Sequence, residues 1–335
     1  MKPDEFDRAV AKGDLGPLYY LYGDEPYLLE KALKRLLDTV VPDFRDFNLN
    51  IFYGKECKGV EAADAAQTLP MFAERRAVVI KEADALSAAA LETLAGYIQS
   101  PSPSTVLVLV GEKPDQRKKF ILDFKKKGEM VEFKRPYEDQ LIPFIRSEAA
   151  LHGKKIAPDA ANALVYMIGA NLQELASQLE KVATFAGARD PLTLDDIKAV
   201  ASDTRIDSVF DLADSLGRRN FPKALRALGK LLGDGEAPVY VLAMITRHFR
   251  QLWSVRELMD KKLPQAEIGK AAKINPYFLK GVMEQAKNFR VPELQGFFER
   301  FYETDLALKS SGGRPNLLLE RLVMDICGVE REGRR

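Results

Sequence analysis

The first 135 residues alternate between short apolar runs and longer segments whose apolar residues recur every three or four positions. The short runs are rich in β-branched and aromatic residues, which is typical of buried strands. Strands are therefore expected at 17–22, 48–53, 76–80, 105–110 and 131–133. The longer segments predict helices at 27–41, 60–70 and 87–100. Strands that alternate with helices predict a parallel α/β sheet.

After Pro136 the pattern contains no convincing strand, and proline and glycine separate segments with helical spacing. Helices are expected at 137–152, 158–168, 171–186, 193–202, 206–217, 221–232, 238–259, 264–271, 275–287, 291–310 and 315–328. The predicted fold class is therefore α/β plus all-α. We expect three domains: an α/β module at 1–135, a small helical domain at 136–205 and a helical C-terminal domain at 206–335.

The composition is that of an ordinary globular protein. Lysine and arginine number 50 against 49 aspartate and glutamate residues, and 46% of residues are hydrophobic, which excludes low-hydrophobicity disorder. No apolar run approaches the roughly 18–20 residues that span a bilayer, and the charged N-terminus lacks the apolar region of a signal peptide. Since Cys57 and Cys327 are the only cysteines, a disulfide framework is disfavoured. We expect a cytoplasmic protein without a membrane association.

The same counts exclude much chemistry. His152 and His248 are the only histidines and lie far apart in the sequence, so a structural zinc site is disfavoured. The chain contains no Gly-x-Ser-x-Gly, His-Glu-x-x-His or Cys-x-x-Cys motif. A triad hydrolase would depend on one of those two histidines. We expect no catalytic residues, no metal and no cofactor.

A phosphate-binding loop would belong between the first strand and the helix that follows it. A P-loop has the pattern Gly-x-x-x-x-Gly-Lys-Ser/Thr, whose backbone N–H groups and lysine hold phosphates. The segment here is GDEPYLLEKAL, which has one glycine, Gly23. Asp24 and Glu25 add negative charge where phosphates would lie. The sequence therefore predicts a helix start that repels ATP.

The segment RAVVIKEADALSAAALETLAGYIQSPSPSTVLVLVGE resembles the middle of an AAA+ module of the clamp-loader kind. In active members this strand ends in Asp-Glu, which supports magnesium and positions water, but Lys81-Glu82 stands here. The resemblance also places a phosphate-contacting arginine near Gln173, and glutamine lacks that charge. Together with Gly23, Asp24 and Glu25, these differences predict a degenerate nucleotide site on an AAA+ scaffold without ATPase activity.

The chain as a whole resembles the family of delta subunits of the bacterial DNA polymerase III clamp loader. The stretches that carry the resemblance are LYYLYGDEPYLLEKAL, QTLPMFAERRAVVI, NLQELASQLEKVATF, LAMITRHFRQL and TDLALKSSGGRPNLLLERLV, in this order. The resemblance implies a degenerate AAA+ module, a helical lid and a helical collar that joins gamma or tau subunits and delta prime in a pentameric ring. It also implies a non-catalytic subunit that binds the beta sliding clamp and holds its ring open for loading onto primed DNA.

The segment Gln67-Thr68-Leu69-Pro70-Met71-Phe72 places large apolar groups between a predicted helix and strand. Such a turn is expected at the surface, where methionine and phenylalanine side chains can anchor a partner. The resemblance makes Met71 and Phe72 a clamp-binding wedge that Leu69 and Gln67 support, while Pro70 stiffens the helix exit. The alternative is a buried pair, because both residue types are usually found in cores.

Four basic residues of the C-terminal domain are candidates for DNA or subunit contact: Arg247, Arg250, Lys309 and Arg314. Subunit packing is the favoured role for the two arginines of the predicted 238–259 helix. Two other functions stay open for the whole chain, an active AAA+ ATPase with an unusual nucleotide site and a DNA-binding regulator. Residues 206–335 carry 22 basic and 17 acidic side chains, a modest excess for a regulator.

Overall fold

The protein is described here by a computed structural model that covers residues 1–202, 205–272, 274, 276–310 and 314–329. It forms two compact units, Met1–Pro136 and Tyr137–Arg335. The first unit ends one residue after the expected end of the α/β module. The second unit contains both expected helical domains, and their division at residue 205 stays a prediction.

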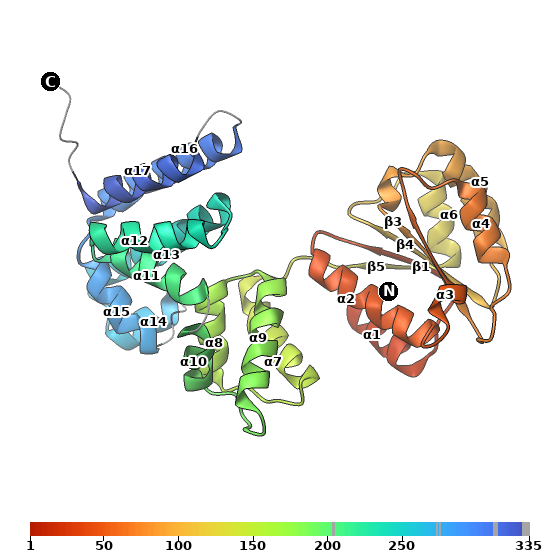
Figure 1. Cartoon of the computed structure of the whole chain (residues 1–335), viewed down its shortest axis with the longest axis horizontal. Coiled ribbons are helices and arrows are strands. Elements are labelled where there is room, and N and C mark those ends of the chain that lie inside the picture. The colour runs from red at the N-terminus through yellow and green to blue at the C-terminus, as the bar shows by residue number, and fades with distance from the viewer. Residues whose placement is uncertain (203–204, 273, 275, 311–313, 330–335) are drawn as a thin grey trace. The chain divides into compact units, whose positions relative to one another are not determined.

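The first unit is built on one sheet of five parallel strands (Figure 1). The strands are β1 (Leu18–Tyr22), β2 (Leu49–Tyr53), β3 (Arg76–Lys81), β4 (Thr105–Gly111) and β5 (Glu129–Glu132). Their order across the sheet is β2-β3-β4-β1-β5, so β2 and β5 are the edge strands. The predicted sheet is confirmed, and every crossover between its strands returns the chain to the same end, as parallel pairing requires.

Helices cover both faces of this sheet (Figure 1). They are α1 (Pro3–Lys12), α2 (Pro26–Val40), α3 (Arg45–Asn48), α4 (Gly59–Gln67), α5 (Ala88–Gln99) and α6 (Lys119–Lys127), with a 3-10 turn η1 at Ala83–Ala85. Alternate residues of β1 point to opposite faces: Tyr20 packs with α4, α5 and α6, whereas Tyr19 packs with α1 and α2. Both faces are apolar because both are covered, which explains why the strands read as continuous apolar runs.

The described residues of the second unit form helices joined by turns and loops, with no strand apart from one isolated bridge between Ile156 and Leu192. It begins with a 3-10 turn η2 (Glu138–Gln140). The helices are α7 (Leu141–Leu151), α8 (Pro158–Ile168), α9 (Leu172–Ala186), α10 (Leu194–Ser202), α11 (Arg205–Gly217), α12 (Phe221–Gly233), α13 (Pro238–Asp260), α14 (Gln265–Ala271), α15 (Pro276–Ala286), α16 (Val291–Lys309) and α17 (Pro315–Cys327). The predicted α/β plus all-α fold class is confirmed. None of the described helices is long and apolar enough to cross a bilayer.

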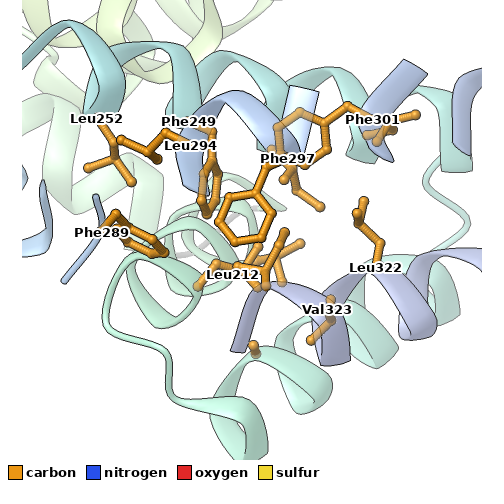
Figure 2. Packing of buried hydrophobic residues seen from close by; sticks show 14 of the residues in the cluster. Leu212, Phe249, Leu252, Phe289, Leu294, Phe297, Phe301, Leu322 and Val323 are labelled. Carbon is orange, nitrogen blue, oxygen red and sulfur yellow. The ribbon is translucent and has the colours of Figure 1, made fainter. Parts of the chain in front are cut away.

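An aromatic cluster fills the C-terminal part of this unit (Figure 2). Phe249 on α13 is fully buried, and its ring meets those of Phe289, Phe297 and Phe301 edge to face at centroid distances of 5.4, 5.6 and 5.6 Å. Edge-to-face pairs add to the stabilisation from burial alone. The apolar stripe of α16 is therefore internal at Leu294, Phe297 and Phe301.

His248 is the one buried histidine among the described residues, and it belongs to a series of hydrogen-bonded polar side chains. Its Nε2 is 2.8 Å from Gln285 Oε1, and Gln285 Nε2 donates to Asp214 Oδ1 at 2.8 Å. Because the glutamine oxygen accepts, the histidine Nε2 must donate. Burial lowers the pKa of His248 to about 4, from an ordinary value of 6.5.

This shift predicts a loss of stability in acid. An unfolded chain takes up a proton on His248 below about pH 6.5, whereas the folded chain resists protonation down to about pH 4. Above pH 6.5 this histidine therefore leaves the free energy of unfolding unchanged. As the pH falls from 6.5 towards 4, that free energy decreases, by about 2 kcal/mol near pH 5. Urea unfolding of the wild type and of His248→Gln at pH 7 and pH 5 measures it. We expect the variant to lose less stability than the wild type between these pH values, and an equal loss would contradict the assignment.

Candidate protein-docking site

Residues 68–75, here called the docking loop, connect α4 to β3 and carry three exposed apolar side chains. The exposed fractions are 73% for Leu69, 49% for Met71 and 79% for Phe72. These values exclude the alternative that Met71 and Phe72 are core residues of the first unit. Single exposed apolar residues are ordinary, but three within four positions of one loop are typical of a surface that a partner covers.

Gln67 and Pro70 are the other two residues of the predicted motif. Gln67 is the last residue of α4 and is exposed, and the helix stops there, three residues before its expected end. Pro70 is half-buried between the exposed Leu69 and Met71. Proline removes a backbone donor and fixes φ, so it favours an extended exit from the helix at this point. The motif residues thus lie on one short segment of the surface.

The buried side chain of Asn48 holds the middle of the docking loop. Its Oδ1 accepts a hydrogen bond from Met71 N at 2.8 Å, and its Nδ2 donates to Met71 O at 2.7 Å and to Phe44 O at 3.2 Å. Asn48 has no exposed surface. A primary amide offers a donor and an acceptor side by side, so it can pair with both polar backbone groups of one residue.

The guanidinium of Arg76 holds the beginning of the docking loop. Its Nη1 lies 3.2 Å from Thr68 O and 3.4 Å from Leu69 O, and its Nη2 donates to Asn50 Oδ1 at 2.7 Å. Arg76 is 5% exposed, and burial lowers its pKa from the usual value. The loop is therefore attached at two points. Neither Asn48 nor Arg76 was singled out from the sequence, where the only signal is a polar residue beside or within an apolar strand.

Two aromatic residues at this surface have left-handed backbones. Phe72 has a φ of 57° and Phe44 a φ of 53°, and their ring centroids are 6.0 Å apart. The left-handed conformation costs a residue with a Cβ roughly 1–2 kcal/mol. Such strain persists where surrounding contacts impose it, and it concentrates at functional surfaces.

The glycine expected at a phosphate loop serves a different purpose. Gly23 is buried with a φ of 145°, and a Cβ at this position would lie 2.0 Å from the carbonyl oxygen of Phe133. The chain after β5 passes directly over the end of β1, and Phe133 N donates to Tyr22 O at 2.7 Å. Close backbone packing therefore accounts for a glycine at this position.

Replacing Gly23 with alanine is expected to destabilise the first unit by about 1–3 kcal/mol, because either the backbone of Phe133 or the end of β1 must move. Thermal unfolding of the full chain measures the effect. Gly96→Ala on α5 is a matched control, since an added Cβ there meets nothing within 4 Å and the glycine is helical. A Gly23→Ala variant as stable as Gly96→Ala would contradict the close packing.

Two carboxylates occupy the start of α2. Asp24 Oδ1 accepts a hydrogen bond from Arg135 N at 2.9 Å. Glu25, the residue before the helix, is 7% exposed and lies 3.6 Å from Arg135 Nε. The N-terminus of a helix attracts anions through its free N–H groups. Here the protein's own carboxylates already supply negative charge at that place.

The end of β3 is also engaged in internal contacts. Lys81 Nζ forms an ion pair with Glu30 Oε1 at 2.8 Å, and Glu82 is exposed with a φ of 53°. Asp84 Oδ1 accepts from the hydroxyl of Tyr20, and its other oxygen accepts from the backbone N–H groups of residues 112 and 113. Burial and the nearby Asp84 raise the pKa of Tyr20, so this hydroxyl stays a donor. Among the described residues, no three His, Cys, Asp or Glu side chains gather as a metal site requires.

Gln173 and the basic candidates belong to the second unit. Gln173 is exposed on α9. Arg247 is turned inward: its Nη2 donates to Val165 O near the end of α8, and burial lowers its pKa. Arg247 therefore joins two parts of one unit. Arg250, Lys309 and Arg314 are exposed, and Lys309 forms an ion pair with Asp305 at 2.7 Å. Residues 311–313 of the expected loop lie outside the described residues.

Two family models match the chain. "DNA polymerase III, delta subunit" covers residues 19–134, and "DNA polymerase III delta subunit, C-terminal domain" covers residues 206–326. The chain is 31% identical over 330 residues to the DNA polymerase III subunit delta of Bacillus subtilis, which spans 95% of both chains. It is 23% identical over 259 residues to a probable DNA polymerase III subunit delta of Aquifex aeolicus, which spans 73% of this chain and 72% of the relative. A solved structure of a Bacillus subtilis DNA clamp loader delta protein is similar with 30% identity and a TM-score of 0.60, over 97% of this chain and 99% of that one.

Proposed function

The chain belongs to the family of DNA polymerase III delta subunits, and we propose that it binds the beta sliding clamp and holds one interface of that ring open during loading onto primed DNA. The observation that carries this proposal is the docking loop. Leu69, Met71 and Phe72 are exposed together on a loop that two buried side chains fix in place. A preformed apolar surface binds without the entropic cost of ordering a free loop.

The subunit would then open the clamp through the difference between its binding free energies for the open and the closed ring. A ligand shifts a conformational equilibrium only by its differential affinity for the two states. The docking loop must therefore bind the open clamp more tightly than the closed clamp. Apolar side chains that fill a pocket accessible only in the open ring supply such a difference. No covalent chemistry by this chain is needed for that step.

We propose further that the chain has no ATPase activity of its own. Asp24 and Glu25 surround the helix start with negative charge, Lys81 is paired with Glu30, and Gly23 is packed beneath Phe133. A phosphate at the start of α2 would therefore meet negative charge, and the lysine at the end of β3 is already engaged in an ion pair. The gamma or tau subunits would supply ATP hydrolysis, and with delta prime they would complete the assembly around primed DNA.

Binding of the purified full chain to the beta clamp of the same organism tests the proposal. We expect complex formation in the absence of nucleotide, with an affinity that MgATP leaves unchanged. A clamp whose two interfaces are covalently crosslinked is the matched control, because it cannot open. It should bind more weakly than the uncrosslinked clamp. Absence of binding would refute the clamp-binding function, equal binding to both clamps would refute ring opening, and hydrolysis of MgATP by the isolated chain would refute the inactive site.

A further inference from the structure

We propose that the docking surface for the clamp has a second half, the turn at residues 42–48, in which Phe44 contacts the partner and Asn48 is the positioning residue that aligns both halves. This inference rests on the proposed function and specifies its contact surface. The partner that covers this second half is the same beta clamp that the docking loop binds, because the two halves are continuous. The ring of Phe44 lies 6.0 Å from that of Phe72, although 28 positions separate the two residues.

The side chain of Phe44 has no role that the fold explains. It is 53% exposed, and its backbone has a φ of 53°, in the left-handed region that glycine and asparagine adopt most readily. A turn that only had to reverse the chain would be more stable with either of those residues. The aromatic ring therefore costs stability here and leaves apolar surface in water. A partner that covers the ring explains both features.

Asn48 joins this turn to the docking loop through backbone groups. One amide pairs with the N–H and the C=O of Met71 at 2.8 and 2.7 Å, and the same Nδ2 donates to the carbonyl of Phe44 at 3.2 Å. Met71 directly precedes Phe72. The buried side chain of Asn48 therefore fixes the backbone at Met71 and at Phe44, and beside Phe72. Rigid support of this kind makes a contact surface precise.

The surroundings of the anchors have the composition of an interface. The apolar side chains are bordered by charged ones, and Arg45 next to Phe44 is held by Asp38 at 2.5 Å and by the carbonyl of Val41 at 3.0 Å. An apolar centre with a polar rim is the usual anatomy of a specific protein contact. Phe47, three residues further on in the short helix α3, is equally exposed at 54%, but its ring makes no contact with Phe72 among those the structure describes.

Phe44 and Phe47 therefore form a matched pair for the first experiment. They share residue type, exposure and the 42–48 turn, and differ in contact with the docking loop. Full-length Phe44→Ala is expected to bind the beta clamp at least tenfold more weakly than the wild type, as a buried anchor does. Phe47→Ala is expected to remain within about twofold of the wild type. Equal affinities for the two variants would overturn the role of Phe44.

Asn48→Leu tests positioning, because leucine has the same branching of heavy atoms but cannot form hydrogen bonds with Met71. We expect affinity for the clamp to fall by about tenfold or more, and amide exchange of residues 69–74 to become faster. Val79→Ala, a core change in β3, controls for a general loss of stability. This control should neither weaken clamp binding nor change amide exchange in the docking loop. If Asn48→Leu binds as the wild type does, or no worse than Val79→Ala, Asn48 is a structural residue only.

A double-mutant cycle separates positioning from a contact of its own. In a Phe44→Ala/Met71→Ala/Phe72→Ala background, Asn48→Leu should weaken residual clamp binding by less than about twofold, since the three side chains it positions are gone. An undiminished effect would overturn the positioning role. If the wild type does not bind the clamp, the proposed function and this inference both fail. If the wild type binds and the Met71 and Phe72 changes abolish binding while Phe44→Ala and Asn48→Leu do not, only this inference fails.

Discussion

Simultaneous replacement of Met71 and Phe72 by alanine is expected to weaken binding of the beta clamp by at least about a hundredfold without unfolding the protein. Both side chains are exposed in the free protein, so their removal leaves no cavity in it. In a complex they would be buried, and anchor residues at the centre of an interface each contribute about 2 kcal/mol or more. Two such losses correspond to a factor of roughly a hundred to a thousand in the dissociation constant.

Surface plasmon resonance or calorimetry with the purified clamp measures this loss, and circular dichroism with thermal unfolding establishes that the fold persists. A matched control is the pair Val60→Ala and Leu122→Ala, which removes two exposed apolar side chains, at 58% and 46%, from α4 and α6 of the same unit. This pair should bind as the wild type does. Binding that survives the Met71 and Phe72 change would place the contact elsewhere, and equal loss in the control would mean that the effect is not specific.

Replacement of Phe249 by alanine is expected to destabilise the second unit by about 3–5 kcal/mol. The ring is fully buried at the centre of the aromatic cluster in Figure 2, where the rings of Phe289, Phe297 and Phe301 surround it. Its removal forfeits the transfer of the ring out of water and leaves a cavity between helices that can only partly collapse. A loss of this size is a large fraction of the stability of a typical domain.

Differential scanning calorimetry of the full chain tests this expectation, because the two compact units permit separate transitions. The transition of the helical unit should move to a lower temperature, while that of the α/β unit stays in place. Tyr302→Ala on α16 is the control, since its side chain is 65% exposed and its loss should change stability by no more than about 0.5 kcal/mol. Similar effects of Phe249→Ala and Tyr302→Ala would contradict the packing shown here.

Most of the fold was predictable from local pattern. All five strands and the change from α/β to all-helical structure at Pro136 follow from apolar periodicity and from proline and glycine positions. The sequence interpretation missed α1, α3 and α6. The helices α1 and α6 bury only two and three apolar side chains within strongly charged segments, and α3 is a single turn whose one aromatic residue, Phe47, faces water. Each of these helices offers only a few apolar positions to a pattern search, because few of its residues enter the core.

The candidate site was predictable only in part. The segment from Gln67 to Phe72 was recognisable by its composition and by resemblance to the family, and so was the loss of the phosphate loop around Gly23. The pattern alone favoured a buried Met71 and Phe72, however, because these residue types usually lie in cores. The exposure of both side chains in the structure reversed that inference. Arg247, for which contact with a neighbouring subunit was favoured over DNA, bonds within its own unit to Val165.

The sequence by itself determined the elements of this protein, because helices and strands depend on neighbours three, four or two positions away. Only the tertiary structure decided what holds the docking surface. Asn48 reaches Met71 across 23 positions, Arg76 reaches Asn50 across 26, and Phe44 meets Phe72 across 28. Such contacts exist because parallel pairing of β2 with β3 brings the segments at their ends together. No local pattern encodes that pairing, since it depends on the packing of both sheet faces at once.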